Sequence, residues 1–577
     1  MQETTTAPAD VRLKRLAPYL LAAVALLVLL PANHLIPLVD RDEPRFAQAT
    51  REMIQRSEWI VPYFNNEYRF DKPILIYWMM RVTYALFGVN EFAARLPSVL
   101  STILLVLIVC QMGARWFSAR AGFLAAFGLL TCVQVLMHGR SAVADMPMVA
   151  MVALAQYALY ELLHDESPRY PWKWFWLFYG ALGLGFLAKG PVTLAVPILT
   201  LLFMRLAFWR KPIPWSRLRI LPGLVVVAVL MGVWGIPALL RTRGLFWSQG
   251  METHVWERGF ETFQGHGAFF LYYFATALLS LFPWSAFFGD GLTAVKRNWS
   301  EKNAFLLSWF LGTYLLFSFY KTKLPHYVMP AFPAVFLMLG QAVDSADRAP
   351  RAARGWFWTV TGIVTAVAVV AIPAAFIIPF SAAYLPLRKA LLAGAGLLLS
   401  LAALGILWRR GAQRALVLPL VAVAVCLSFL GAGLRAVSPA VQLVPLFREM
   451  PEDTVYGFHG FREPSLVFYA GRPWQGLEET RDLQAFLNKA GPRLVVVEEK
   501  EIRAEDLVRP LFDKPPRGRD FTAELAQIRA EGYEQRSVEG LNIARTSAAR
   551  LKSSSIARPS SVTSTFAGLR SRCTMPR

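Results

Sequence analysis

The sequence contains a succession of long apolar blocks separated by short polar segments. A helical block of about 20 apolar residues matches the hydrocarbon thickness of a bilayer. Hydrophobic residues make up 55% of the 577 residues and charged residues 17%, against roughly a quarter charged in soluble proteins. These properties exclude an ordinary soluble enzyme, a disordered protein and a disulfide scaffold. The sequence therefore predicts a polytopic α-helical membrane protein.

About thirteen of these blocks are long enough to be read as membrane-spanning helices. They cover residues 17–37, 97–114, 121–137, 147–163, 174–188, 191–208, 220–240, 268–289, 304–320, 328–344, 356–379, 389–408 and 415–434. The first block is too long for a signal peptide and lacks a small-residue cleavage site, so we expect a retained anchor. An odd number of spans would place the two ends of the chain on opposite sides of the membrane.

Arginine and lysine concentrate in alternate loops between the apolar blocks. The clusters are Arg12/Lys14/Arg15, Arg115/Arg120, Arg205/Arg210/Lys211/Arg217/Arg219, Lys296/Arg297, Arg348/Arg351/Arg354 and Arg409/Arg410/Arg414. The positive-inside rule assigns these loops and the N-terminus to the cytoplasm. It also accounts for much of the net charge of +21, from 60 Lys and Arg against 39 Asp and Glu. We therefore expect no nucleic-acid partner.

The composition predicts three regions along the chain. Residues 1–434 form the transmembrane domain, with an outer loop at 38–96 that carries interfacial helices. Residues 435–548 contain short β-like runs (VYGF, SLVFYA, RLVVVEE and LNIART) and a helical stretch near 480–490, a pattern that indicates a small α/β domain outside the cytoplasm. Residues 549–577 are rich in Ser, Thr and Arg and are expected to be a disordered tail.

The outer loop begins with an acidic pair in the segment LVDRDEPRFAQATREM. On a helix, Asp42, Arg45, Ala49 and Glu52 share one face. An amphipathic helix lying in the membrane interface would explain that pattern. It explains less well why Asp42 and Glu43 stand directly after a spanning helix, so this pair is a candidate catalytic site.

The same loop continues with RFDKPILIYWMM. Pro73 marks the expected start of a helix, and Tyr77 suits the aromatic belt at the interface. Lys72, just before that start, would place its ammonium beside exposed backbone N–H groups, an arrangement that favours a phosphate. A lysine that snorkels to the interface is an equally consistent interpretation.

Three further segments bring charged residues to the predicted outer side. Asp145 in HGRSAVADMPM opens a spanning helix, and an acid so close to hydrocarbon indicates function. Lys323, His326 and Tyr327 stand in KTKLPHY, and Lys189 stands in FLAKGP. Basic residues on this side run against the positive-inside tendency, whereas a binding site for a phosphorylated lipid accounts for them.

The loop at 241–267 contains Arg258, His254 and His266. The two histidines are weak candidates for a metal site, because their spacing matches no standard zinc motif, and an ordinary interfacial loop is the simpler interpretation. A divalent metal therefore stays open as a cofactor, and no other cofactor is expected. The stretch GALGLGFLAKG lies within a spanning helix and indicates helix packing through small residues rather than a phosphate loop.

The order of these motifs resembles a known family. An acidic DE pair in a long first outer loop, DKPILIYW, a second acid in ADMP, and KLPHY are similar to the motifs of the lipid-to-lipid aminoarabinose transferases. These enzymes are membrane-embedded C-type glycosyltransferases, related to the protein O-mannosyltransferases. The resemblance covers residues 1–435, and the C-terminal α/β region also fits it. The Arg- and Ser-rich tail departs from the pattern.

The resemblance implies a reaction and assigns roles to residues. The family transfers 4-amino-4-deoxy-L-arabinose from undecaprenyl phosphate to phosphate groups of lipid A at the periplasmic face of the bacterial inner membrane, which modifies lipopolysaccharide and gives polymyxin resistance. Asp42 and Asp145, with Glu43, are the expected catalytic carboxylates. The donor phosphate and the substrates are expected to contact a basic and aromatic set: Lys72, Arg258, Tyr327, His326, Lys323, Arg45, Tyr77 and Lys189.

Two other functions are consistent with the sequence. A protein O-glycosyltransferase that uses a polyprenyl-phosphate sugar would need Asp42 as a general base, because a hydroxyl acceptor must lose its proton. A lipid flippase without chemistry would place polar residues along a path through the membrane and would show related halves. The polar residues of this chain are confined to one face, which disfavours the flippase.

Overall fold

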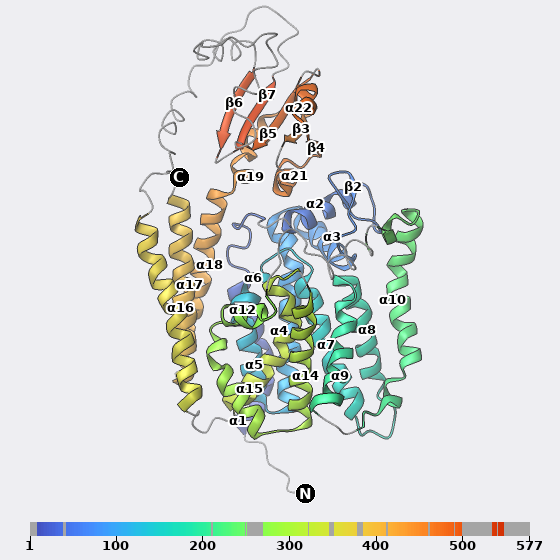
Figure 1. The fold of residues 1–577 in the computed structure, drawn as a ribbon, viewed down its shortest axis with the longest axis vertical. Helices are drawn as coiled ribbons and strands as arrows, with labels where there is room; N and C mark the ends of the chain where they lie inside the picture. Colours follow the sequence, from blue (N-terminus) through green and yellow to red (C-terminus); the bar gives the residue numbers. More distant parts are fainter. Residues whose placement is uncertain are drawn as a thin grey trace, which may run out of the picture. The chain divides into compact units, whose positions relative to one another are not determined.

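The computed structural model describes residues 8–38, 42–208, 212–248, 250, 269–320, 322–344, 351–377, 385–410, 413–459, 462–487, 489, 491–498, 533–538 and 541–546. The chain divides into two compact units. The membrane unit comprises Met1–Val444 and Glu463–Pro473, and the C-terminal unit comprises Pro445–Arg462 and Trp474–Arg577. Figure 1 shows the elements of both units in chain order.

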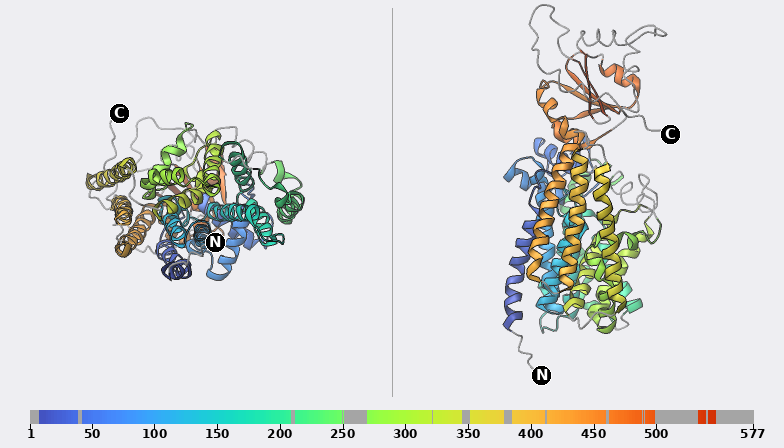
Figure 2. Two further views of the ribbon diagram at one scale, coloured as in Figure 1. Left: turned by 90° about the horizontal axis from the view of Figure 1, so that it is seen from below. Right: turned by 90° about the vertical axis from the view of Figure 1, so that its left-hand side faces the viewer.

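The membrane unit is built from helices that run side by side (Figures 1 and 2). Its helical segments are α1 (Pro8–Leu29), α2 (Asp42–Gln55), α3 (Leu75–Phe87), α4 (Glu91–Trp116), α5 (Ala119–Thr131), α6 (Val133–His138), α7 (Asp145–His164), α8 (Trp172–Lys189), α9 (Val192–Phe203), η1 (Met204–Phe208), η2 (Trp215–Leu218), α10 (Ile220–Arg241), α12 (Tyr272–Ser280), η4 (Trp284–Phe287), α13 (Phe288–Arg297), α14 (Glu301–Phe319), η5 (Pro325–Ala331), α15 (Phe332–Asp344), α16 (Arg351–Ile377), α17 (Leu385–Arg409), η7 (Gln413–Leu416), α18 (Val417–Val437), α19 (Pro439–Gln442) and α21 (Pro464–Ala470).

Each predicted apolar block coincides with helix, but not each forms one continuous span. Among the described residues, seven helices are long and apolar enough to cross a membrane, or eight if one bent pair is counted. The protein is thus a helical multi-pass membrane protein. The block at 268–289 is bent, because α12 meets the segment Trp284–Arg297 at an angle of 111°. The first helix also ends at Leu29, eight residues earlier than expected.

Two interruptions of the helices are joined to each other by hydrogen bonds. The block at 121–137 is interrupted at Cys132, whose backbone is extended between α5 and α6. The Val133 N–H donates to the Phe282 carbonyl oxygen at 3.0 Å, and Trp284 Nε1 donates to Thr131 Oγ1 at 2.9 Å. The interruption near Cys132 thus pairs with the interruption between α12 and α13. Backbone groups that leave the helical ladder inside a membrane need such internal partners.

Helix α7 is at the centre of the membrane unit. In the apolar stretch of this helix, 89% of the residues are buried inside the protein. The helix packs against α4, α8 and α9. Small residues on α8 permit the close packing that the stretch GALGLGFLAKG predicts. A Cβ atom at Gly183 would lie 2.5 Å from Leu230 of α10, and one at Gly185 would lie 2.3 Å from Thr193 of α9.

Helix α2 is largely enclosed by protein. Nine of its residues are buried, among them Glu43, Phe46 and Glu52. Its place in the membrane interface stays a prediction. Glu52 accepts hydrogen bonds from the backbone N–H groups of Asn65 at 2.8 Å and Asn66 at 3.0 Å. These residues form the turn of the hairpin β1 (Tyr63–Phe64) and β2 (Glu67–Tyr68), so the carboxylate holds the hairpin against α2.

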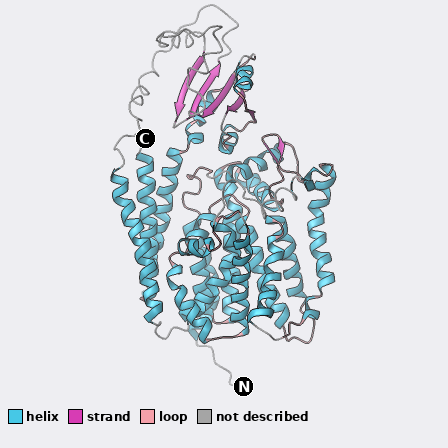
Figure 3. Ribbon diagram, in the orientation of Figure 1, coloured by secondary structure: helices cyan, strands magenta, loops and turns pink. Residues whose placement is uncertain are grey.

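The C-terminal unit contains a five-stranded mixed sheet (Figure 3). Its strands are β3 (Val455–His459), β4 (Trp474–Leu477), β5 (Arg493–Glu498), β6 (Tyr533–Val538) and β7 (Leu541–Thr546), in the order β4-β3-β5-β7-β6. The β3 strand is parallel to β4 and β5, whereas β7 is antiparallel to β5 and β6. Helices α20 (Val444–Glu449) and α22 (Thr480–Leu487) accompany the sheet. The expected tail at 549–577 lies outside the described residues.

One predicted strand is a helix. The run SLVFYA forms α21, which begins after an N-cap at Glu463, has Pro464 at its first turn, and ends at Gly471 with φ of +69°. Glycine adopts that left-handed conformation without a steric penalty. The run resembles a strand in the sequence because six residues are too few to show a helical period. Although α21 lies between β3 and β4 in the chain, it belongs to the membrane unit.

Candidate active site

Asp145 is the first residue of α7, and the structure surrounds it with basic side chains. Its carboxylate is buried and accepts a hydrogen bond from Lys189 Nζ, at the end of α8. His326 Nε2, in η5, lies 3.9 Å from the same carboxylate oxygen. The three residues come from three separate motifs of the sequence, which the fold brings together as predicted.

Two further basic residues extend this cluster. The ring of His138 lies 4.9 Å from the ring of His326, measured between centroids, and His138 Nδ1 lies 3.0 Å from Gln134 Nε2. Lys72 acts electrostatically on His326. Asp145 is therefore accompanied by the ammonium of Lys189 and by two imidazole rings, groups that can donate hydrogen bonds to an anionic ligand.

The aromatic and basic residues of KTKLPHY lie beside this cluster. Tyr327 is half-buried, and Lys189 Nζ lies 5.6 Å from the centroid of its ring. Lys323 is buried and donates to the Tyr320 carbonyl oxygen at 2.5 Å. Lys323 thus binds the backbone at the end of α14, whereas His326 and Tyr327 face the Asp145 cluster.

A second charged group forms around Arg69, three positions before Lys72 in the chain. Arg69 is buried, forms an ion pair with Asp71 at 2.6 Å, and donates from Nε to Tyr77 Oη at 3.1 Å. Burial alone would lower the pKa of Arg69, but the nearby Tyr77, Asp71 and Asp42 raise it above its ordinary value. Burial also raises the pKa of Tyr77 to about 12. Both groups therefore keep their protons at neutral pH.

Glu43 has a different environment from its neighbour Asp42. Its carboxylate is buried and pairs with Arg95 of α4 through two hydrogen bonds, of 2.9 and 2.8 Å. It also accepts from the Ala142 N–H at 2.6 Å, in the loop that leads to Asp145. This contact fixes the beginning of α2 and the approach to α7 in one arrangement.

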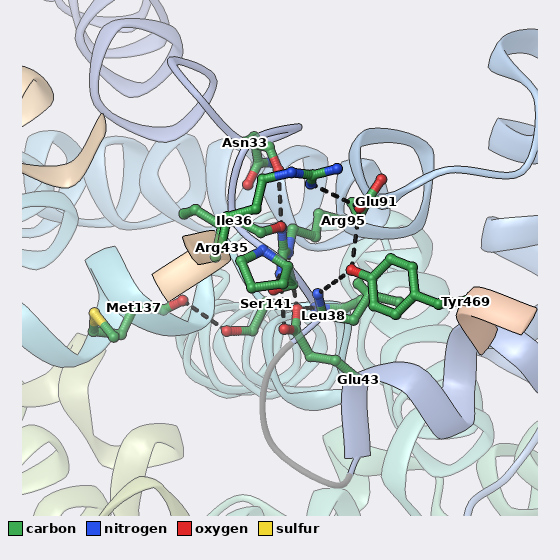
Figure 4. Close-up of polar contacts among 12 residues, drawn as sticks. Asn33, Ile36, Leu38, Glu43, Glu91, Arg95, Met137, Ser141, Arg435 and Tyr469 are labelled. Atoms are coloured by element: carbon green, nitrogen blue, oxygen red, sulfur yellow. Dashed lines mark hydrogen bonds and ion pairs between the residues drawn. The ribbon is translucent and has the colours of Figure 1, made fainter. Parts of the chain in front are cut away.

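Arg95 also binds the backbone of the segment that leads to α2 (Figure 4). Its guanidinium donates to the carbonyl oxygens of Asn33 at 2.8 Å, Ile36 at 2.6 Å and Pro37 at 2.6 Å. These carbonyls belong to the segment between α1 and α2. The side chain therefore neutralises Glu43 and satisfies the backbone of the connection that leads to the acidic pair.

The remaining predicted residues have different outcomes. Asp42 is the first residue of α2 and is exposed, whereas Arg45 is half-buried on the same helix. Lys72 does not directly precede a helix at Pro73, because α3 begins at Leu75 with Ile74 as its N-cap. Lys72 is half-buried in the preceding loop. Arg258, His254 and His266 lie outside the described residues.

The sequence analysis missed three residues of this region: Arg69, Arg95 and His138. Arg69 lies in a loop without periodicity, so only its closeness to the DKP segment could have drawn attention to it. Arg95 had a stronger signal, because an arginine near the beginning of a spanning helix needs a partner. His138 lies in the quoted segment HGRSAVADMPM, seven positions before Asp145.

The described residues of this region offer cationic and imidazole side chains to a ligand. Throughout these ranges, no three His, Cys, Asp or Glu residues are arranged to hold a metal ion. The arrangement instead offers ammonium, guanidinium and imidazole groups, which bind phosphate oxygens through charge-assisted hydrogen bonds. The carboxylate of Asp145 is bound by Lys189, whereas Asp42 is exposed.

Comparison with known proteins agrees with this geometry. Residues 71–234 match the family model described as dolichyl-phosphate-mannose-protein mannosyltransferase. Among curated proteins, the chain is 31% identical over 361 residues to an undecaprenyl phosphate-alpha-4-amino-4-deoxy-L-arabinose arabinosyl transferase of Enterobacter sp. (strain 638). It is 32% identical over 381 residues to the protein of the same name from Pectobacterium carotovorum.

These alignments cover part of each protein. They span 61% of this chain and 64% of the Enterobacter protein, and 62% of this chain and 66% of the Pectobacterium protein. The chain thus spans just under two thirds of the length of the relatives that it matches.

The fold is shared over a longer stretch. The crystal structure of ArnT from Cupriavidus metallidurans bound to undecaprenyl phosphate superposes with a TM-score of 0.74, over 92% of this chain and 98% of that chain, at 20% identity. The apo structure gives a TM-score of 0.73. The predicted C-type glycosyltransferase fold and the resemblance to the aminoarabinose transferases are therefore both confirmed.

Proposed function

We propose that this protein is a glycosyltransferase that moves 4-amino-4-deoxy-L-arabinose from undecaprenyl phosphate to phosphate groups of lipid A. The observation that carries the proposal is the cluster around Asp145, in which Lys189, His326 and His138 lie together and Lys72 acts electrostatically on His326. Similarity to proteins named for this transfer supports the choice of sugar and carrier. The outcome would be a modified lipopolysaccharide and resistance to polymyxin.

The chemistry follows from the charges of the substrates. A lipid A phosphate oxygen attacks the anomeric carbon of the sugar, and the bond from that carbon to the undecaprenyl phosphate oxygen breaks. Negative charge then grows on the leaving phosphate, where preorganised cations stabilise it most. In the proposal Lys72 and Lys189 take this role, together with Arg258.

The carboxylates have roles other than strong base catalysis. A phosphate monoester has a second pKa near 6, so the acceptor is already a nucleophile at neutral pH. In the proposal Asp42 binds the ammonium of the sugar or orients the acceptor, and Asp145 positions Lys189 and His326. Glu43 is a positioning residue, because its carboxylate is occupied by Arg95 and the Ala142 N–H.

The proposal includes a topology with thirteen spans in the bacterial inner membrane. The N-terminus is cytoplasmic, and both the Asp42 region and the domain at 435–548 are periplasmic. Cysteines placed at Ser57 and Gln484, in a variant whose four natural cysteines are replaced, should react with an impermeant maleimide in spheroplasts. Protection of either position until the cells are lysed would contradict this topology.

The activity can be tested with purified components. The protein, reconstituted with undecaprenyl-phosphate aminoarabinose and lipid A, should add the mass of one or more sugars to lipid A. The Asp42→Asn variant keeps the size of the side chain and should abolish transfer while donor binding is retained. A folded wild-type protein that leaves lipid A unmodified under these conditions would refute the proposal.

Protein O-glycosylation is a second candidate, because the family model that matches residues 71–234 is described as a protein mannosyltransferase. The same preparation would then modify a Ser- or Thr-containing peptide and leave lipid A unchanged. The two candidates are thus separated by the acceptor that is modified.

A further inference from the structure

Helix α21 contacts α2 and the segment before it, although it lies more than 400 positions later in the chain. Tyr469 of α21 accepts a hydrogen bond from the Leu38 N–H at 3.0 Å. Leu38 stands four positions before Asp42, the candidate catalytic acid. Near the other end of α2, Arg51 donates from NH1 to the Phe468 carbonyl oxygen at 2.7 Å.

Tyr469 is held in place by further charged residues (Figure 4). Its hydroxyl donates to Glu91 Oε1 at 3.1 Å, at the beginning of α4. Arg435 of α18 binds the same oxygen at 3.1 Å. Burial raises the pKa of Tyr469, so the hydroxyl keeps its proton and serves as donor to Glu91 and acceptor for Leu38 at once.

The contact at Arg51 is equally specific. The guanidinium carbon lies 4.5 Å from the centroid of the Phe468 ring, within the range of a cation–π interaction. The same NH1 group donates to Gln48 Oε1 at 3.1 Å, which fixes the side chain along α2. All of these contacts lie within the membrane unit.

We propose that α21 is a positioning element of the transfer site, with Tyr469 as the residue that sets the location of Asp42. This inference rests on the proposed function. The pair of Glu43 and Arg95 holds α2 against α4. Arg51 holds α2 against α21, and Tyr469 holds Leu38, which precedes α2. Displacement of a reacting group by about 1 Å can cost on the order of 100-fold in rate, so a loosened α2 slows transfer without unfolding the protein.

The test compares two tyrosines that make similar hydrogen bonds. Tyr469→Phe removes the hydroxyl contacts to Leu38 and Glu91 and keeps the ring. Tyr179→Phe is the matched control, because its buried hydroxyl donates to the Leu218 carbonyl oxygen at 2.9 Å, between α8 and η2. Both variants lose hydrogen bonds of a buried tyrosine, but only the first loses contacts beside the candidate acid.

We expect kcat of Tyr469→Phe to fall about tenfold, with KM for the donor changed less than twofold, whereas Tyr179→Phe keeps the wild-type kcat. Amide hydrogen exchange over residues 42–55 should become faster in Tyr469→Phe and stay unchanged in the control. Arg51→Lys keeps the charge but loses the bond to Phe468, and should show a weaker form of both effects.

The exchange measurement separates this inference from the proposed function. If the wild-type protein transfers no sugar, the proposed function fails, while faster exchange in α2 would still support the positioning contact. Unchanged exchange over 42–55 together with wild-type kcat in Tyr469→Phe would overturn the inference. An equal loss of kcat in Tyr179→Phe would also overturn it, because the effect would then reflect general destabilisation.

Discussion

The two ends of α7 both have a buried carboxylate, but they differ in what surrounds it. At one end, Glu161 accepts from Arg115 Nε at 2.6 Å and from Trp116 Nε1 at 2.8 Å, one bond for each carboxylate oxygen. Beside it, His164 pairs with Glu301 at 2.9 Å. Glu161 and Glu301 thus each have a basic side chain as a partner.

At the other end, Asp145 lies among ionisable side chains from three other segments of the chain. Lys189 donates to its carboxylate, His326 Nε2 lies 3.9 Å from the same oxygen, and the ring of His138 lies 4.9 Å from that of His326. Ammonium and imidazole groups can donate hydrogen bonds to an anionic ligand. In this protein, therefore, burial of an acid does not by itself distinguish structure from function, whereas the ionisable groups gathered around it do.

The largest expected effect is on stability, at the ion pair that holds the Asp145 end together. Glu43→Gln removes the charge that neutralises the buried Arg95, and removing one partner of such a pair costs about 3–5 kcal/mol. Thermal unfolding in detergent should show a large decrease in Tm. The double variant Glu43→Leu/Arg95→Leu should recover part of it, because no unpaired charge is left. Wild-type Tm with no activity in Glu43→Gln would instead make Glu43 catalytic, as the sequence predicted.

The next effect is on transfer, and it compares the two ends of α7 directly. Asp145→Asn should lower kcat/KM by on the order of 100- to 1000-fold, about 2.7–4 kcal/mol, the scale of losing one preorganised group. Glu161→Gln changes a carboxylate of similar burial on the same helix and should leave kcat unchanged. Equal losses in the two variants, measured as lipid A modified per folded protein, would break the comparison.

Removal of one cation should have a smaller effect. Lys72→Ala is expected to lose about 1.5–3 kcal/mol of phosphate stabilisation, the range for a hydrogen bond to a charged group, with weaker binding of undecaprenyl phosphate. Lys302→Ala is the control, since Lys302 donates to the Trp116 carbonyl oxygen at the Glu161 end. Donor titration of both variants checks this prediction, and unchanged binding in Lys72→Ala would argue against it.

The smallest effect is expected at an exposed pair, Arg241 with Glu58 at 2.6 Å. Burial raises the pKa of Glu58, but hydrogen bonds from the Ile60 N–H and from Arg241 outweigh it, and the pKa lies below its ordinary value. The pair therefore stabilises the folded state above the unfolded pKa, and this contribution is lost as the pH falls through the folded pKa. Arg241→Gln should cost about 0.2–1 kcal/mol at pH 7 and nothing in strong acid, as denaturant unfolding at the two pH values would show.

Much of the site could be predicted because its residues are polar or charged, whereas the sequence around them is apolar. Asp145, Lys189 and His326 are polar groups at the ends of apolar segments, and such positions indicate function. Their common location then follows from counting spans. Glu43 could not be assigned in this way, since adjacent residues on a helix point about 100° apart, and no pattern tells which of Asp42 and Glu43 faces Arg95.

The fold was predicted well where hydrophobicity alone decides it, and less well where tertiary contacts do. The bend between α12 and α13 lies inside a continuous apolar run, and only Pro283 marks it in the sequence. Helix α21 was missed because SLVFYA has the composition of a strand, while its Glu463 cap and its terminal Gly471 become meaningful only once the helix is known. Short segments carry too little periodicity to overrule composition.

The paired interruptions near Cys132 and Phe282 have a consequence for protein engineering. Each supplies the partner that the other lacks, through Val133 with Phe282 and Thr131 with Trp284. If only one of them is redesigned as a straight helix, for instance to obtain a more stable scaffold, a polar group of the other loses its hydrogen-bond partner. The bilayer core contains no water that could replace that partner. The two segments therefore have to be redesigned, exchanged with a relative or grafted as a single cassette, even though 150 positions separate them.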